Sequence, residues 1–425
     1  MKHQKNFEWV KLDNASKMFP ATWSLKDPKV FRIHCELLDI IDPNVLQKAL
    51  DITINDFPLY RSVLRRGVFW YYLESSEITP EVTEESKPVC APVYVGLKNN
   101  LLFRVTYYNK RINLEIFHVL SDGAGAVRFL TSLVCRYLAL CHREAFAASA
   151  LSPEDFSMSE RMDDSYKKHY IGGEAFRRLA KAEKKRNKRK AYQIRGMRTA
   201  ENRVALIEGA MPTEAVLVKA HSYNASLTVF ISSLFIYSIY KEMPTRKKNQ
   251  PIVLTVPVNL RQFFESGTAR NFFGFIDAGF NFEKNTDDLG TITCAIGERF
   301  KECLTEERLN YQLYKNMAMQ QNPLVRGLPL PIKDLLIRAA ARSYDRYTTS
   351  NISNIGRIVL PPEFCPYIRQ FGVCTSVRRP QLTLCSYEGR LVISITSPYK
   401  ETAIQMTFFR LLSKMGITVE IASNI

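Results

Sequence analysis

A histidine, an aspartate and a glycine follow one another at the end of an alternating stretch of this chain. Residues 112–123 read INLEIFHVLSDG, so that His118 stands four residues before Asp122 and five before Gly123. Side chains of a strand alternate between its two faces, and His118 therefore shares the face of the apolar residues at 112, 114 and 116. We expect a strand that carries His118 toward the interior.

These three residue types can together support a proton transfer coupled to attack on a carbonyl group. A histidine held near its ordinary pKa of about 6.5 can act as a base near neutral pH. The glycine offers an unhindered backbone N–H to a developing oxyanion, and the acid is a second polar group close by. The alternative that these residues leave open is a hydrogen-bonded core histidine before a turn.

Strands and helices alternate around this segment. Apolar periodicity in the first half predicts strands at 29–39, in 61–73 and in 101–117, the last a hairpin turning near 109–110, and helices at 42–54 and 127–141. The second half is predicted to hold strands at 204–207, 252–257, 272–282 and within 348–395, and helices at 213–223, 227–241, 288–319 and 331–344. The fold class is thus α/β with mixed sheets, in two halves of similar size.

A strongly basic run separates the two halves. With 425 residues the chain exceeds the size of a single core, and its periodicity is lost between 145 and 200. We therefore predict an N-terminal subdomain at 1–175, a basic linker at 176–200 and a C-terminal subdomain at 201–425. Residues 177–198 carry eleven Lys or Arg and one acid, which accounts for +10 of the net charge of +17.

The composition of this linker bears on the partners of the chain. Tyr192 is the one aromatic residue in the run, so we expect no stacking platform for bases and no specific nucleic acid partner. A solvated linker is the favoured interpretation. Contact with an acidic membrane surface or with anionic phosphates is the alternative.

Cysteine usage and apolar runs indicate the compartment. The nine cysteines show no Cys-x-x-Cys pair and no zinc-ligand spacing, which is typical of free thiols in a reducing cytoplasm and predicts no metal site. The N-terminus lacks the apolar run of a signal peptide. The apolar stretch at 226–240 is too short to span a membrane and is better interpreted as a core helix. We expect a cytoplasmic protein.

Three further segments accompany the His-x-x-x-Asp-Gly motif in a fixed order. They are FPLYRS at 57–62, PVNLR at 257–261 and SNIGR at 353–357. The set resembles the CoA-dependent acyltransferase superfamily, which includes chloramphenicol acetyltransferase, the condensation domains of nonribosomal peptide synthetases and plant acyltransferases. The segment LDNASKMFP at 12–20 looks most like the bacterial alcohol acetyltransferase branch. The resemblance covers nearly the whole chain except the basic linker.

The resemblance implies a fold and a reaction. It implies two chloramphenicol acetyltransferase-like subdomains with a tunnel between them, in which donor and acceptor meet. His118 would take the proton from an acceptor alcohol or amine as it attacks the thioester of an acyl-CoA, without an acyl-enzyme. The Gly123 N–H would donate to the oxyanion. Acyl-CoA would be a co-substrate, and no cofactor would be bound permanently.

The resemblance also assigns roles to other residues. In the superfamily the acid of the motif pairs with an arginine and holds the loop, so we expect an Asp122–Arg61 ion pair, with Arg261 as the rival partner. A buried pair of this kind would make Asp122→Ala damage folding as much as catalysis. The remaining candidates for contact with a substrate are Ser353, Asn354, Asn259 and Arg261. His221 is interpreted as a core or partly exposed histidine.

Departures from the superfamily pattern narrow the prediction. Condensation domains usually carry two adjacent histidines, whereas Phe117 stands at the first position here. The Asp-Phe-Gly-Trp-Gly signature of the plant branch is only echoed by NFFGF at 271–275. A free-standing acyltransferase that uses acyl-CoA fits best. The alternatives are a condensation enzyme with a donor bound to an acidic carrier protein and a catalytically silent binding protein.

Overall fold

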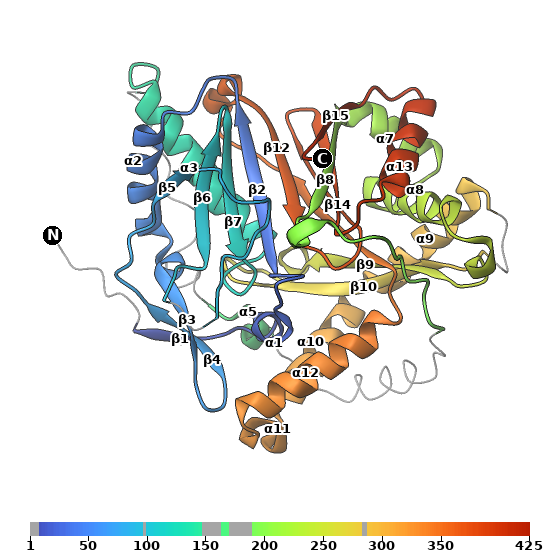
Figure 1. Ribbon diagram of the computed structural model, residues 1–425, viewed down its shortest axis with the longest axis horizontal. Helices are drawn as coiled ribbons and strands as arrows, with labels where there is room; N and C mark the ends of the chain where they lie inside the picture. Colours follow the sequence, from blue (N-terminus) through green and yellow to red (C-terminus); the bar gives the residue numbers. More distant parts are fainter. Residues whose placement is uncertain (1–7, 97–98, 147–162, 170–188, 283–286) are drawn as a thin grey trace.

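The computed structural model describes residues 8–96, 99–146, 163–169, 189–282 and 287–425 (Figure 1). The part of the basic run at 177–188 lies outside the described residues, so the linker prediction stays a prediction. Within the described residues, strands form one sheet of five, one of seven and one of three. The expected α/β class with mixed sheets is therefore confirmed.

The five-stranded sheet carries the strand that leads to His118. Its order is β12-β2-β7-β6-β5, in which β5 is parallel to β6 and the other pairs are antiparallel. The strands are β12 (Ile368–Thr375), β2 (Val30–Leu37), β7 (Arg111–Phe117), β6 (Phe103–Tyr108) and β5 (Val82–Glu84). Helices α2 (Pro43–Thr53) and α3 (Gly123–Cys141) pack against each other beside this sheet (Figure 1).

The seven-stranded sheet lies beside the first, with order β10-β9-β11-β13-β14-β8-β15. Its strands are β8 (Ala205–Pro212), β9 (Ile252–Asn259), β10 (Phe273–Phe280), β11 (Ser350–Arg357), β13 (Gln381–Tyr387), β14 (Arg390–Ser397) and β15 (Glu420–Ser423). Helices α7 (Thr213–Ser222), α8 (Leu227–Lys241), α9 (Leu289–Cys303) and α13 (Ala403–Lys414) accompany it. Ten of the fifteen residues of α8 are buried, so this apolar stretch is a core helix.

A third group of elements forms the lower part of the molecule in Figure 1. Strands β1 (Trp9–Lys11), β4 (Tyr71–Ser75) and β3 (Ser62–Arg66) make the small sheet. The helices are α1 (Met18–Thr22), α5 (Ser165–Lys168), α10 (Glu306–Gln321), α11 (Pro323–Gly327) and α12 (Leu330–Asp345). Short 3-10 turns lie at Ile54–Asp56, Pro58–Arg61, Ala200–Asn202, Thr245–Lys247, Leu260–Gln262 and Pro362–Tyr367.

Two features of the fold differ from the sequence-based expectation. The helix expected at 288–319 is broken between α9 and α10, because Thr305 leaves the helical conformation and its hydroxyl accepts from the Arg308 N–H at 3.4 Å as an N-cap. In addition, β12 belongs to the C-terminal half of the sequence but pairs with β2 of the first sheet from Ile368 to Thr375. The division of the chain at 175 and 200 thus stays a prediction, with one strand of the later half placed in the earlier sheet.

Candidate active site

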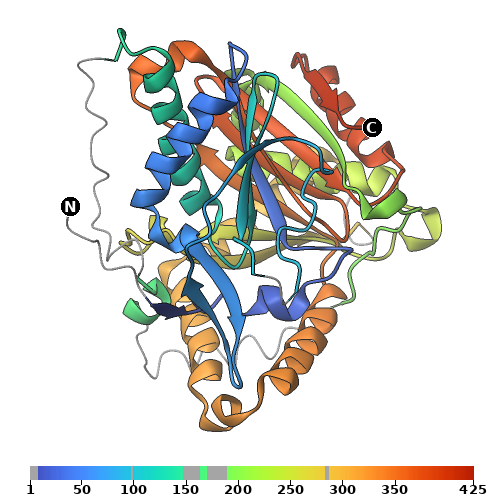
Figure 2. The ribbon, with the colours of Figure 1, turned by 60° about the vertical axis from the view of Figure 1, so that its left-hand side comes forward.

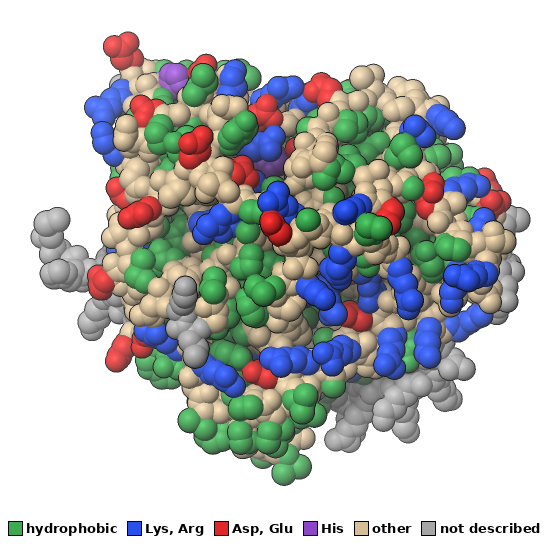
Figure 3. Space-filling model, in the orientation of Figure 1, with side chains coloured by type: hydrophobic (Ala, Val, Ile, Leu, Met, Phe, Trp, Pro, Cys, Tyr) green, Lys and Arg blue, Asp and Glu red, His purple; other side chains and the backbone are tan. Residues whose placement is uncertain are grey.

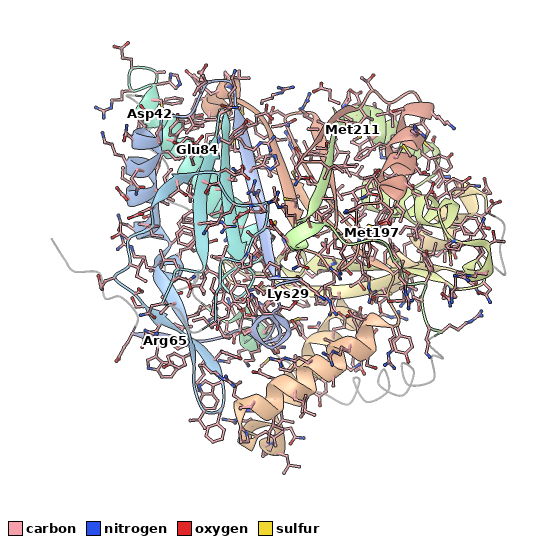
Figure 4. The ribbon with its side chains drawn as sticks, viewed as in Figure 1. Lys29, Asp42, Arg65, Glu84, Met197 and Met211 are labelled. Carbon is pink, nitrogen blue, oxygen red and sulfur yellow. The ribbon has the colours of Figure 1, made fainter. Side chains whose placement is uncertain are left out.

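His118 follows directly on the last residue of β7. The backbone N–H of His118 donates to the Lys29 carbonyl at 2.9 Å, which extends the pairing of β7 with β2 by one residue. Lys29 is labelled in Figure 4, close to α1. The imidazole stacks on the Phe19 ring of α1, with centroids 4.4 Å apart, and lies 4.8 Å from the Phe31 ring. The side chain is therefore held between aromatic rings at the junction of α1 and the first sheet.

Asn271 decides which nitrogen of His118 carries the proton. The Asn271 amide nitrogen donates to the His118 carbonyl at 3.0 Å and to the Ser16 hydroxyl at 2.9 Å, so its oxygen must face the imidazole. That oxygen lies 3.1 Å from His118 Nδ1. An amide oxygen can only accept, hence Nδ1 is the protonated nitrogen. The lone pair on Nε2 is left for a substrate proton.

The surroundings of His118 keep it neutral. Burial lowers the pKa of His118 below its ordinary value, and the nearby negative charge of Asp122 opposes this effect without cancelling it. A neutral imidazole at pH 7 is the form that a base requires.

A network of buried polar side chains holds the Asn271 amide in place. The Ser16 hydroxyl lies 2.6 Å from Asp13 Oδ2 and 2.9 Å from the Val119 carbonyl. Asp13 lies 3.7 Å from the Arg270 guanidinium, and burial raises the pKa of Asp13 despite that positive charge. Sequence reasoning gave none of these residues a role. The signals were present, because Asp13 and Ser16 lie in the segment 12–20 and Asn271 begins the segment 271–275, both noted for their resemblance.

Asp122 pairs with Arg261, so the expected pairing with Arg61 is wrong. Arg261 donates to Asp122 Oδ2 at 2.8 Å, and both side chains are buried. Arg61 ends the turn Pro58–Arg61, whose Leu59 enters the core, and its guanidinium donates to a solvent-exposed asparagine, Asn55, at 3.2 Å. The turn that buries its apolar residues leaves Arg61 on the outside. The rival partner is the one that the structure supports.

Both carboxylate oxygens of Asp122 have fixed structural partners. Oδ1 accepts from the Gly125 N–H at 3.0 Å and caps α3, and Oδ2 also accepts from the Phe272 N–H at 2.9 Å. The Arg261 guanidinium donates in addition to the carbonyls of Thr268 and Arg270. Asp122 therefore ties the start of α3 to the segment before β10, and this same segment carries Asn271.

Two glycines shape the first turn of α3. A Cβ on Gly123 would lie 2.6 Å from Cδ1 of Ile355, which reaches across from β11. A Cβ on Gly125 would lie 2.2 Å from the Ala269 carbonyl oxygen, which is backbone and cannot rotate away. The first N–H groups of a helix have no acceptor within the helix and carry the positive end of its dipole. Gly123 thus presents a donor five residues after His118.

The other candidate residues fall into two groups. Asn259 lies beside the Asp122 pair, where its side-chain oxygen accepts from the Arg261 guanidinium at 3.2 Å. Asn354 is held within the fold, because it donates to Thr228 at 2.9 Å and accepts from the Gly356 N–H at 2.8 Å. Ser353 is half-buried in β11, directly before Asn354. Ile355, the residue after Asn354, is the neighbour that a Cβ on Gly123 would meet.

The described residues offer no grouping typical of a metal site. Within the described part of the chain, no three His, Cys, Asp or Glu side chains come together as metal ligands would. All nine cysteines are free thiols. Helix α3 is long and apolar enough to cross a membrane, yet half of its most apolar window is buried within the protein, as in a core helix. His221 is exposed on α7, in line with a role outside the site.

Comparisons with known proteins identify the fold. No protein-family profile matches the chain, and no curated protein matches its sequence. The first condensation domain of the CDA synthetase is similar in structure, with a TM-score of 0.67, 13% identity and 97% of each chain covered. Polyketide synthase associated protein 5 from Mycobacterium tuberculosis gives a TM-score of 0.62 at 15% identity, covering 95% of this chain and 96% of its own.

A third structure was determined with a ligand. A variant of the starter condensation domain of rhizomide synthetase, in complex with C8-CoA, gives a TM-score of 0.64 at 14% identity over 96% of this chain and 94% of its own. The chain therefore has the two-subdomain fold of condensation domains, as the sequence predicted.

Proposed function

We propose that this protein transfers an acyl group from a thioester, foremost acyl-CoA, to an alcohol or amine. The observation that carries the proposal is the hydrogen bond that fixes the His118 tautomer. Asn271 Oδ1 lies 3.1 Å from Nδ1, which leaves Nε2 as a base in a residue five positions before the start of α3. A buried histidine kept only for packing would also need a partner for Nδ1. The support therefore comes from this hydrogen bond together with the N–H that Gly123 presents at the start of α3. The fold shared with condensation domains supports the same reaction class.

The proposed reaction needs one base and one oxyanion donor. Nε2 of His118 takes the proton of the acceptor O–H or N–H while the acceptor atom forms a bond to the thioester carbon. The carbonyl oxygen becomes an oxyanion, to which the Gly123 N–H donates. The intermediate collapses, the C–S bond breaks, and the imidazolium returns its proton to the leaving thiolate. No acyl-enzyme forms, and Asp122 acts by holding α3 in place.

Acyl-CoA is proposed as the donor, and a carrier-bound acyl group is the alternative. The complex of the starter condensation domain with C8-CoA supports the first choice, since that relative in fold binds an acyl-CoA. The motif of this chain has Phe117 in place of a first histidine, which favours a stand-alone acyltransferase over peptide-bond formation. Whether the acceptor is an alcohol or an amine depends on the residues that line its path.

Thiol release from acyl-CoAs of graded chain length, with a panel of alcohols and amines, tests the proposal. We expect turnover by the native protein and its loss in His118→Ala, while circular dichroism stays native. Full activity of His118→Ala would exclude His118 as the base. No thiol release from any donor, free or carrier-bound, would favour the silent binding protein.

A further inference from the structure

Large apolar side chains gather on an exposed corner of the molecule, well away from the core. Figure 3 shows hydrophobic side chains clustered at the lowest part of the molecule, over α11 and α12. The exposed fractions in this region run from 39% to 81%, whereas the side chains of the core are almost fully buried. We call this region the apolar tip, and its members are Val68, Phe69, Trp70, Leu324, Ile332, Leu335 and Leu336.

Helix α12 turns its apolar stripe outward. Ile332, Leu335 and Leu336 follow the spacing i, i+3, i+4 of one helix face and are 46%, 65% and 54% exposed. The opposite face carries the buried Asp334, which accepts from the Tyr71 hydroxyl at 2.8 Å. A helix of a soluble protein ordinarily shows the reverse arrangement. The outward stripe therefore indicates a surface that is covered in use.

The apolar tip is held firmly in place. The Leu330 N–H donates to the Val68 carbonyl at 2.8 Å, and Lys333 Nζ donates to the Phe69 carbonyl at 2.9 Å. These bonds join α12 to the loop between β3 and β4. Further along the helix, Arg338 donates to the Ala21 carbonyl of α1 at 2.6 Å. The exposed side chains thus belong to two elements that are tied to each other and to the body of the protein.

Positive charge surrounds the apolar tip. Residues 323–344 contain four basic residues, Arg326, Lys333, Arg338 and Arg342, and the single acid Asp334 is buried. Lys11 lies over the Trp70 ring, with Nζ 4.7 Å from its centroid. Figure 3 shows further Lys and Arg side chains along the edge of the tip. An anionic surface would be attracted here. The other carboxylate of these two helices, Asp345, ends α12 away from α11 and pairs with Arg378 and Arg379.

We propose that the apolar tip docks the protein on an anionic lipid surface. The tip protrudes, since α11, the ends of α10 and α12 and the β3–β4 hairpin converge on one end of the molecule (Figure 2). A protruding set of aliphatic side chains with a tryptophan and a basic border matches the interfacial region of a bilayer, where apolar side chains enter the acyl boundary and cations meet headgroups. An acidic protein partner is the alternative that the test distinguishes.

The proposed docking on lipid does not depend on the proposed acyl transfer. The two proposals meet at α1, which bonds to α12 through Ala21 and stacks Phe19 on His118. If acyl transfer also operates, the lipid surface would lie next to an element of the active site.

Cosedimentation with phosphatidylcholine vesicles, with and without phosphatidylglycerol, tests the proposal. We expect binding that increases with phosphatidylglycerol and falls with salt, and that weakens by at least about tenfold in Leu335→Ser/Leu336→Ser. The matched control is Ile40→Ser/Val359→Ser, because those side chains are 74% and 68% exposed outside the tip. The control should bind like the native protein.

Tryptophan quenching by brominated lipids locates the contact. Trp70 belongs to the tip, and Trp9 is 51% exposed on β1. Quenching should disappear in Trp70→Phe and persist in Trp9→Phe. Replacing the basic residues of 177–190 with glutamine should leave quenching in place.

Three results would overturn the proposal. They are no binding to anionic vesicles at low salt, binding that only the 177–190 replacement abolishes, and capture of an acidic carrier protein through Leu335 and Leu336 without any vesicle binding. Thiol-release activity is measured in parallel on the same variants. A protein that binds vesicles but lacks acyl transfer would then contradict only the proposed function.

Discussion

The contact between Asn271 and His118 leads to the most specific prediction. Asn271→Leu keeps the approximate size of the side chain but removes the oxygen that lies 3.1 Å from His118 Nδ1. The imidazole then loses the acceptor that defines its tautomer. Because His118 becomes positively charged as it takes the substrate proton, the lost hydrogen bond is stronger in the transition state than in the resting protein.

The size of the effect follows from that difference. A hydrogen bond contributes about 1 kcal/mol between neutral groups and ~1.5–3 kcal/mol when one group is charged. The transition state therefore loses ~0.5–2 kcal/mol more than the ground state, which is a fall in kcat of about twofold to thirtyfold. KM should change little, since the Asn271 amide is engaged by His118 and Ser16. The free energy of unfolding should fall by about 1–3 kcal/mol, because the His118 carbonyl loses its buried donor.

Thiol-release kinetics and nitrogen NMR of the histidine ring measure the two consequences. The control is Ser16→Ala, which removes the other partner of the Asn271 amide at 2.9 Å but leaves its oxygen on Nδ1. This control should keep most of kcat and the Nδ1–H tautomer. An Asn271→Leu protein with native kcat and an unchanged tautomer would refute the reasoning.

Three further predictions concern pH and the glycines. Since burial lowers the pKa of His118, activity should be level above pH ~7 and fall at acid pH with an apparent pKa below about 6.5; a midpoint above pH 7 in the rate profile would contradict this. Gly123→Ala should lower kcat with a small loss of stability, because the new methyl group meets the rotatable end of the Ile355 side chain. In Gly125→Ala the methyl group meets a backbone carbonyl, so this variant should lower the melting temperature strongly. Equal melting temperatures of the two variants would count against this geometry. Burial alone would raise the pKa of Glu208, but the charge of His34, whose Nε2 lies 3.5 Å away, lowers it to about 2. The stability that Glu208 contributes is therefore complete above pH ~4.5 and is lost as the pH falls toward 2. Glu208→Gln should cost about 3 kcal/mol in urea unfolding at pH ~5, where a histidine ordinarily carries its charge, and should flatten this acid dependence.

Local periodicity predicted most elements of the fold. The strand at 29–39, the helix at 42–54 and the hairpin turning near 109–110 correspond to β2, α2 and β6–β7. The break between α9 and α10 was missed, because apolar spacing continues across it while the Thr305 cap interrupts the backbone. The placement of β12 beside β2 was also missed, since strand pairing between distant segments leaves no periodic signal.

The sequence by itself determined the parts of the site that depend on neighbours in the chain. Alternation brings the strand to His118, and Asp122 caps the helix that starts at Gly123, since both effects act over a few residues. Only the tertiary structure decided that Asp122 pairs with Arg261, 139 residues away, and that Asn271, 153 residues from His118, sets its tautomer. Such contacts depend on how two sheets and their loops pack, and no local spacing encodes that packing.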